Sequence, residues 1–152
     1  MKIALFPGSF DPVTKGHENI ALRALPLFDK IIIAIGENSV KKSLFSLEQR
    51  IIWLEECFKK ESKIEVKSYK GLTVNFCQEV NAQYIVRGVR NSHDFLYEKE
   101  IAQMNKALAP QIETVFLGTA TEYAAISSTV IRDIYTYNGD FKQFMPNNIT
   151  FP

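Results

Sequence analysis

The sequence lacks several features that mark common classes of protein. Its 152 residues include two cysteines and two histidines, with no C-x-x-C pair, which excludes the usual structural zinc patterns. Cys57 and Cys77 are therefore interpreted as buried free thiols. The longest purely apolar run, Ile31 to Ile35, is too short to span a bilayer, and no signal-peptide pattern follows Met1. With a net charge of +1, no overall field favours nucleic acid or an anionic membrane as a partner. We expect a cytoplasmic protein.

Apolar runs alternate with segments of helical period along the whole chain, with no linker or repeat. This alternation predicts a single α/β domain over residues 1–152, with a doubly wound, five-stranded parallel sheet, helices on both faces and a Rossmann-like dinucleotide-binding fold. Strands are expected at Lys2–Phe6, Lys30–Gly36, Ile64–Tyr69, Tyr84–Arg87 and Glu113–Leu117. Helices are expected at about Thr14–Leu25, Leu72–Val80, Ser92–Leu108 and Ser127–Tyr137, and around the apolar face Leu47, Ile51, Leu54 and Phe58, where Ser46 and Gln49 suggest a capping box.

The first strand leads into the run Pro7-Gly8-Ser9-Phe10-Asp11-Pro12-Val13-Thr14-Lys15-Gly16-His17. This is neither of the common glycine signatures for nucleotides, G-x-x-x-x-G-K-[ST] or G-x-G-x-x-G. Its glycine still lets the backbone approach an anion, and the following helix presents free N–H groups and the positive end of its dipole. His17 can donate to phosphate oxygens while neutral. The run predicts a phosphate site; the alternative is a histidine that only caps its helix.

Arginines also lie at the end of the fourth expected strand, in Arg87-Gly88-Val89-Arg90. Two guanidinium groups beside a glycine can bind phosphate oxygens in a forked geometry. The alternative is a surface salt bridge, because Arg90, Asp94 and Glu98 are spaced by four residues and are expected to share one helix face.

Three further junctions are weaker candidates. Lys41 and Lys42 lie in the loop after the second strand, where lysines are mostly solvated. Hydroxyl groups in Ser127-Ser128-Thr129 open the last helix and could hold phosphates or only cap it. The segment Gly71 to Phe76 could line a pocket for an uncharged arm of a substrate, or simply pack.

Together these segments resemble the bacterial phosphopantetheine adenylyltransferases, a family of the nucleotidyltransferase superfamily, from Lys2 to about Pro146. The matching motifs are P-G-S-F-D-P-x-T-x-G-H at Pro7–His17, K-K at Lys41–Lys42, F-S-L-E-x-R at Phe45–Arg50, R-G-x-R with D-F-x-Y-E at Arg87–Glu98, and I-S-S-T at Ile126–Thr129. The first and the fourth are specific, whereas T-x-G-H and I-S-S-T alone indicate the superfamily. The chain departs from the family at Thr73, where members often carry a larger apolar residue, and in its short C-terminus.

The resemblance implies an enzyme of coenzyme A biosynthesis that transfers the adenylyl group of ATP to 4′-phosphopantetheine, giving 3′-dephospho-coenzyme A and pyrophosphate. It implies Mg²⁺ carried by the nucleotide, no metal held by the protein, and a homohexamer. The implied catalytic residues are His17, at the α-phosphate, Lys41 and Arg90. The implied contacts to the acceptor substrate are Ser9, Lys41, Thr73 and Arg87. The implied ATP contacts are Ser9, Phe10, His17, Gly88, Val89, Arg90, Glu98, Tyr123, Ala124, Ala125, Ile126, Ser127, Ser128 and Thr129.

This reaction also suits the absence of an obvious general base. The attacking phosphate and the departing pyrophosphate are both anionic near neutral pH, so orientation and charge stabilisation are sufficient. Two alternatives stay open. One is another nucleotidyltransferase, of the nicotinate mononucleotide or cytidylyl type, although the chain lacks R-T-x-G-I-S-T-T before Ile126. The other is a non-catalytic nucleotide sensor, which is expected to lose His17, Lys41 or Arg90.

Overall fold

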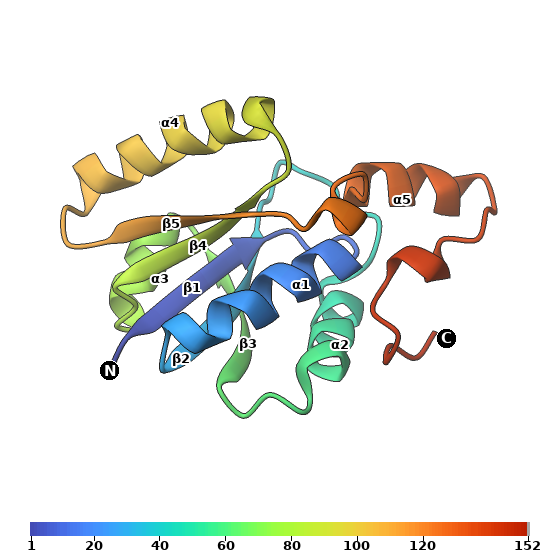
Figure 1. Cartoon of the computed structure of the whole chain (residues 1–152), viewed down its shortest axis with the longest axis horizontal. Helices are drawn as coiled ribbons and strands as arrows, with labels where there is room; N and C mark the ends of the chain where they lie inside the picture. The colour runs from blue at the N-terminus through green and yellow to red at the C-terminus, as the bar shows by residue number, and fades with distance from the viewer. Residues whose placement is uncertain (152) are drawn as a thin grey trace.

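A computed structural model of the chain describes residues 1–151 and contains one parallel sheet with helices packed around it (Figure 1). The strands run in the order β3-β2-β1-β4-β5. Their bounds are β1 Ile3–Gly8, β2 Lys30–Glu37, β3 Ile64–Lys70, β4 Tyr84–Val89 and β5 Glu113–Gly118. The helices are α1 Lys15–Ala24, α2 Leu47–Phe58, α3 Thr73–Glu79, α4 Ser92–Leu108 and α5 Ser128–Thr136. The predicted α/β fold, with its five-stranded parallel sheet, is confirmed.

Apolar side chains alternate along the central strands and fill two separate layers. Phe6, Ile31 and Ile33 pack with α1 and α2 on one face, where α1 crosses in front of the sheet in Figure 1. Leu5 and Ile32 pack with α3 on the opposite face. Because successive residues of a strand point to opposite sides, a run that is apolar at every position requires both faces to be covered. The prediction of helices on both faces is therefore confirmed.

The strands of the sheet extend one or two residues beyond their predicted ends. In β1, Pro7 pairs with Ala34 of β2, and in β4, Gly88 pairs with Leu117 of β5. A proline normally ends a central strand because it lacks an N–H donor. Here β1 pairs with β4 only through Ala4 and Leu5, so Pro7 lies where these two strands have already separated. Their separation opens a crevice at the carboxyl end of the sheet, where the strand order reverses.

The structure tests two predictions made for α2, the capping box at its start and the buried thiol near its end. Ser46 caps this helix by accepting the Gln49 N–H at 3.1 Å. The second bond of a capping box, from the Ser46 N–H to the Gln49 side chain, is not formed among the described residues. Cys57, near its C-terminal end, is a buried free thiol as predicted, and so is Cys77. Residues 145–151 form no helix and contact α2, where Asn148 donates to the carbonyl of Cys57 at 2.8 Å.

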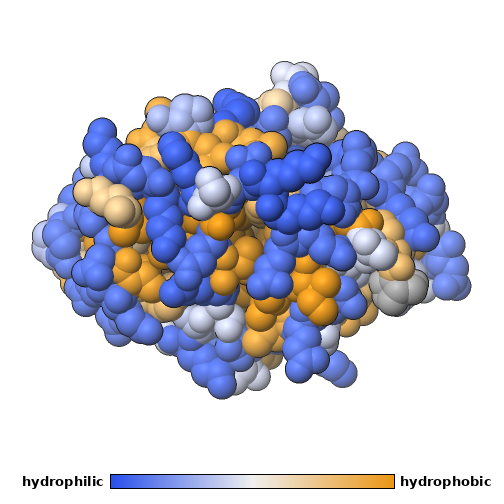
Figure 2. Space-filling model, turned by 90° about the horizontal axis from the view of Figure 1, so that it is seen from below, coloured by the Kyte–Doolittle hydropathy of each residue, from blue (hydrophilic) through white to orange (hydrophobic). Residues whose placement is uncertain are grey.

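The face of the molecule seen from below is covered mostly by hydrophilic side chains, with hydrophobic residues showing between them (Figure 2). Within residues 1–151, no helix has the length and the apolar composition needed to cross a membrane.

Candidate active site

Two adjoining cavities lie at the carboxyl ends of the strands. The first, of about 290 Å³, lies between the ends of β1 and β4 and the first turns of α1 and α5. The second, of about 630 Å³, extends along the ends of β1, β2 and β3 and the inner side of α4. Ser9, Lys41 and Arg87 line both cavities. A ligand in one cavity can therefore meet a ligand in the other beside these three side chains.

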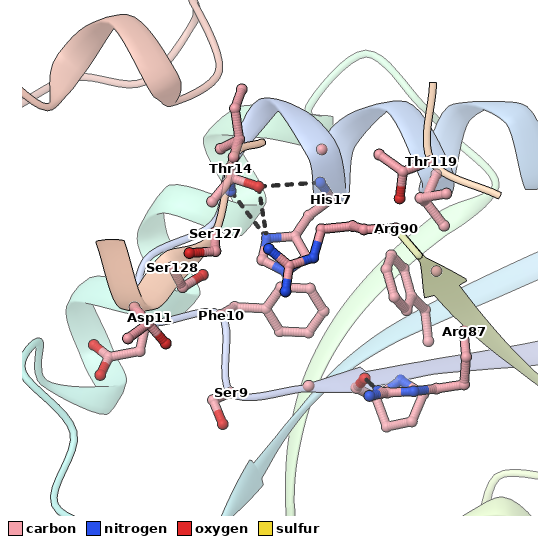
Figure 3. A pocket seen from close by; sticks show the side chains of 18 of the residues that line it. Ser9, Phe10, Asp11, Thr14, His17, Arg87, Arg90, Thr119, Ser127 and Ser128 are labelled. Carbon is pink, nitrogen blue, oxygen red and sulfur yellow. Dashed lines mark hydrogen bonds between the residues drawn. The ribbon is translucent and has the colours of Figure 1, made fainter. Parts of the chain in front are cut away.

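The loop after β1 turns sharply at Phe10, whose φ of 45° is in the left-handed region. This conformation is uncommon for a bulky residue. It buries the Phe10 ring against His17, with ring centroids 5.0 Å apart, and leaves Ser9 exposed (Figure 3). A Cβ on Gly8 would lie only 3.0 Å from the Phe10 ring. Glycine is required there because the ring packs directly over the strand end.

His17 forms a complete capping box with Thr14 at the start of α1. The Thr14 hydroxyl accepts the His17 N–H at 3.2 Å, and the imidazole Nδ1 accepts the Thr14 N–H at 3.0 Å (Figure 3). A nitrogen that accepts a hydrogen bond carries no proton, so the proton of the neutral ring is on Nε2. Nε2 has no hydrogen-bond partner among residues 1–151, and the ring lines the first cavity. Capping therefore leaves His17 free to donate one hydrogen bond to a ligand.

The surroundings of His17 keep this ring neutral. Burial, followed by the positive charges of Arg87 and Arg90, lowers the pKa of His17 from 6.5 to about 4. An imidazole with this pKa is uncharged at physiological pH and acts as a hydrogen-bond donor rather than as a cation.

Arg87 and Arg90 each bind one acidic side chain of α4. Arg87 binds Glu98 through two hydrogen bonds, with Nε to Oε2 at 2.8 Å, and also donates to the carbonyl of Pro7. Arg90 binds Asp94 at 3.0 Å. The i,i+4 salt bridge that was the alternative for Arg90 is therefore present with Asp94. Arg90 itself precedes α4, and Glu98 binds Arg87 instead of lying beside Arg90.

The N-terminus of α5 packs against the loop after β1. The Ser128 hydroxyl donates to the carbonyl of Pro12 at 2.9 Å, and Arg132 donates to the carbonyl of Asp11 at 2.8 Å. Ser127 caps the helix by accepting the Val130 N–H at 3.2 Å. The first turns of α1 and α5 therefore open toward the same cavity, and their free N–H groups favour anions there.

The second cavity is lined by both polar and apolar side chains, among them a pair of hydroxyl groups. The Tyr69 hydroxyl lies 2.8 Å from the Thr73 hydroxyl, and its ring stacks on Phe76 with centroids 4.8 Å apart. Burial raises the pKa of Tyr69, so this phenol stays protonated. Ile85 and Ile101 line other parts of the wall. This lining suits an elongated ligand that has both apolar and amide groups.

The structure brings most of the predicted site residues together. The first cavity is lined by Ser9, Phe10, His17, Lys41, Arg87, Gly88, Arg90, Ile126, Ser127, Ser128 and Thr129. The second is lined by Ser9, Lys41, Thr73, Arg87 and Glu98. Glu98 does not line the first cavity, where most of the predicted nucleotide contacts lie. Val89, Tyr123, Ala124 and Ala125 line neither cavity. Lys42 also lines neither, in contrast to its neighbour Lys41.

Three charged residues beside the cavities have no role predicted from the sequence: Asp11, Arg50 and Arg132. Asp11 and Arg50 are only 4% and 6% exposed. A signal was available for Arg50, because it lies on the same side of α2 as the apolar residues Leu47 and Leu54. A charged residue on a buried helix face requires hydrogen-bond partners nearby.

The chain matches one family model and is similar to several known proteins over nearly its full length. Residues 5–134 match the cytidylyltransferase-like family. A phosphopantetheine adenylyltransferase of Cytophaga hutchinsonii is 53% identical over 97% of this chain and 99% of its own length. One of Flavobacterium johnsoniae is 48% identical over 98% of this chain and 97% of its own length.

A solved structure is also similar in fold. It is a bifunctional NMN adenylyltransferase/ADP ribose pyrophosphatase from Francisella tularensis, which superposes with a TM-score of 0.69 at 21% identity. The match covers 97% of this chain but 46% of that protein, so this chain spans about half of its length. At this identity the likeness concerns the fold alone.

Proposed function

Since the chain belongs to the phosphopantetheine adenylyltransferase family, we propose that it transfers the adenylyl group of ATP to 4′-phosphopantetheine, giving 3′-dephospho-coenzyme A and pyrophosphate. The observation that carries this proposal is the pair of cavities that share Ser9, Lys41 and Arg87. The first cavity, between two helix N-termini, suits the triphosphate of a nucleotide. The second is larger, and its wall combines polar groups with the apolar side chains of Ile85 and Ile101, which suits a pantetheine arm.

In the proposed reaction an oxygen of the acceptor phosphate attacks the α-phosphorus of ATP. The new P–O bond forms as the bond to the bridging oxygen of pyrophosphate breaks, and the electron pair leaves with pyrophosphate. Neither group needs to lose or gain a proton at neutral pH. The enzyme therefore has to align two anions and stabilise the negative charge that develops on the α-phosphate oxygens.

His17 supplies a neutral donor for that charge. Its Nε2–H would contact an α-phosphate oxygen, while its Nδ1 remains bonded to Thr14. Lys41 and Arg90 would add positive charge at the same phosphates, and the first turns of α1 and α5 would bind the remaining oxygens. Tyr123 and Ala124, with Ala125, are proposed to contact the nucleotide outside the first cavity.

The acceptor phosphate is proposed to bind Ser9, Lys41 and Arg87. Glu98 holds Arg87 through two hydrogen bonds, so it fixes the guanidinium plane at the boundary between the cavities. Thr73 would contact the pantetheine arm, and its hydroxyl is paired with that of Tyr69. These hydroxyl groups can donate and accept hydrogen bonds, so an amide of the arm is their expected ligand.

Mg²⁺ is proposed to enter with the nucleotide. The acidic groups beside the cavities already have partners: Asp11 accepts two backbone N–H groups, and Asp94 and Glu98 bind arginines. Phosphate oxygens of ATP are the remaining hard ligands that this ion prefers. When bound, the ion would neutralise part of the triphosphate charge.

Self-association is proposed to occur through α4, which runs along the top of Figure 1. None of its residues is buried, and even the apolar side chains of Leu96, Met104 and Leu108 are 61%, 64% and 58% exposed. A row of exposed apolar residues favours a protein contact. A homo-oligomer, a hexamer by family resemblance, would cover this row. The cytoplasmic location stays a prediction from the sequence.

The test is a coupled pyrophosphate assay with ATP, Mg²⁺ and a panel of acceptors. We expect pyrophosphate release with 4′-phosphopantetheine, and not with nicotinate mononucleotide or with CTP and a phosphorylated alcohol. Release with nicotinate mononucleotide alone would assign the chain to that activity. ATP binding without release for any acceptor would favour a nucleotide sensor.

A further inference from the structure

Two buried charged residues connect the loop after β1 to the loop after β2. The carboxylate of Asp11, in the first loop, accepts the N–H groups of Leu44 and Phe45 in the second, at 2.8 and 2.9 Å. The guanidinium of Arg50, in α2, donates in the opposite direction to the carbonyl of Ser9 at 2.8 Å. It also donates to the carbonyl of Phe45 at 3.1 Å. We refer to Asp11 and Arg50, with these bonds, as the crossed brace.

The chemistry of the crossed brace is unusual for a purely structural contact. Asp11 and Arg50 are almost fully buried and carry opposite charges, yet neither forms an ion pair within residues 1–151. Burying two charges is costly, and apolar packing commonly gives at least equal stability. Charge-assisted bonds to backbone groups are short and directional. Their effect is to fix where the two loops lie relative to each other.

The loops joined in this way carry two of the side chains that line both cavities. Ser9 lies on the first loop, with its carbonyl bonded to Arg50 and the left-handed residue Phe10 after it. Lys41 lies on the second loop, three positions before Leu44, whose N–H is bonded to Asp11. A displacement of either loop would change the distance between the Ser9 hydroxyl and the Lys41 ammonium group.

We propose that Asp11 and Arg50 are positioning residues that set the spacing of Ser9 and Lys41 for the transferred and attacking phosphates. This inference rests on the proposed function. Asp11 acts through the Lys41 loop and Arg50 acts through Ser9, and neither has to touch a substrate. Misplacing a reacting group by about 1 Å can reduce a rate by about a hundredfold.

The test uses the conservative variants Asp11→Asn and Arg50→Lys, with kcat and KM measured for 4′-phosphopantetheine. We expect each to lower kcat/KM by roughly tenfold to a hundredfold. Asp29→Asn and Arg23→Lys are controls at exposed positions, matched in the type of bond that they make. The Asp29 carboxylate also accepts a backbone N–H, from Lys2 at 2.6 Å, and Arg23 also donates to a backbone carbonyl, that of Gly118 at 2.7 Å. Neither lines the cavities, and we expect changes below about twofold.

A second set of variants separates positioning from a general loss of structure. In a Lys41→Met background, Asp11→Asn should lower kcat/KM by less than about twofold further, because the side chain it positions is gone. In a Ser9→Ala background, Arg50→Lys should behave in the same way. Thermal midpoints should still fall additively. If the full rate loss persists in both backgrounds, or if the rates are unchanged in the wild-type background, the proposal is wrong.

A readout without substrate keeps this test independent of the proposed function. Trp53 is the only tryptophan, is 2% exposed, and lies 4.8 Å from the Phe45 ring, centroid to centroid. Asp11→Asn should loosen Phe45 and increase acrylamide quenching of Trp53 in the folded protein, while Asp29→Asn should not. Equal quenching in both would overturn the proposal, and so would failure of both Asp11→Asn and Arg50→Lys to fold. A wild-type enzyme inactive on phosphopantetheine but showing the quenching difference would contradict only the proposed function.

Discussion

Replacement of His17 by glutamine should separate the two roles that the structure gives to this side chain. The imidazole Nδ1 accepts the N–H of Thr14, a residue that is 2% exposed. Glutamine is a common residue at this position of a capping box, and its carbonyl oxygen can accept the same N–H. Its amide N–H is also a donor, but it turns about one more rotatable bond than the imidazole and is therefore not preorganised at the position of Nε2–H. We therefore expect His17→Gln to fold with near wild-type stability and to lose activity.

The magnitudes follow from the two bonds. Removing one preorganised donor to a developing oxyanion costs about 2–4 kcal/mol, which is roughly a thirtyfold to thousandfold fall in kcat. His17→Ala, which has no donor at all, should show at least the same fall. Because it leaves the buried Thr14 N–H unpaired, it should also lose about 1–3 kcal/mol of stability. For a chain of this size that is a fall of roughly 2–12 °C in thermal midpoint.

The assay compares kcat, calorimetric affinity for ATP and thermal midpoint for His17→Gln, His17→Ala and Ser46→Ala. Ser46→Ala removes an N-cap bond from α2 and should reduce the midpoint without a large change in kcat. If His17→Gln keeps wild-type kcat, or if kcat follows the thermal midpoint through all three variants, His17 is a capping residue only.

Three further predictions concern the cations, the pH dependence and α4. Lys41→Met should lower kcat/KM by roughly thirtyfold to a thousandfold while Lys42→Met changes it little, because only Lys41 lines the cavities; equal steady-state effects would contradict this. The pKa of His17 is lowered from 6.5 to about 4 in the folded protein. As the pH falls, His17 is therefore protonated in the unfolded state before it is protonated in the folded state, and the folded state loses stability. Denaturant titrations should therefore show the wild type losing about 2 kcal/mol more than His17→Gln between pH 8 and 5, and parallel losses would refute the neutral ring. Leu96→Asp together with Met104→Asp should reduce the oligomer size measured by light scattering, and an unchanged size would exclude α4 as the contact.

Much of the fold was predictable because its signals are local. Runs such as Ile31 to Ile35, apolar at every position, require a sheet covered on both faces, and both core layers are present. The carboxyl ends of parallel strands share one edge, so Ser9, Lys41 and Arg87 were expected near one another, and all three line both cavities.

What could not be predicted depends on contacts between distant segments. Asp11 accepts the backbone N–H of Leu44, and Arg50 donates to the backbone carbonyl of Ser9, in both cases across more than thirty residues of sequence. No spacing rule within one helix or strand predicts such a contact. Glu98 was expected beside Arg90 from its helical spacing, but it binds Arg87 because β4 carries that arginine under α4. For His17, the sequence suggested capping and catalysis as alternatives. The capping box shows that one nitrogen can cap while the other remains free.

The central claim is tested most directly by following the phosphorus atoms of ATP. The wild-type enzyme would be incubated with 4′-phosphopantetheine, Mg²⁺ and ATP labelled at either the α- or the γ-phosphorus, and the products separated by chromatography and identified by mass. Attack at the α-phosphorus places the α-label in 3′-dephospho-coenzyme A and the γ-label in pyrophosphate. The γ-label in a phosphorylated acceptor, or no labelled product from this acceptor, would contradict the proposed adenylyl transfer.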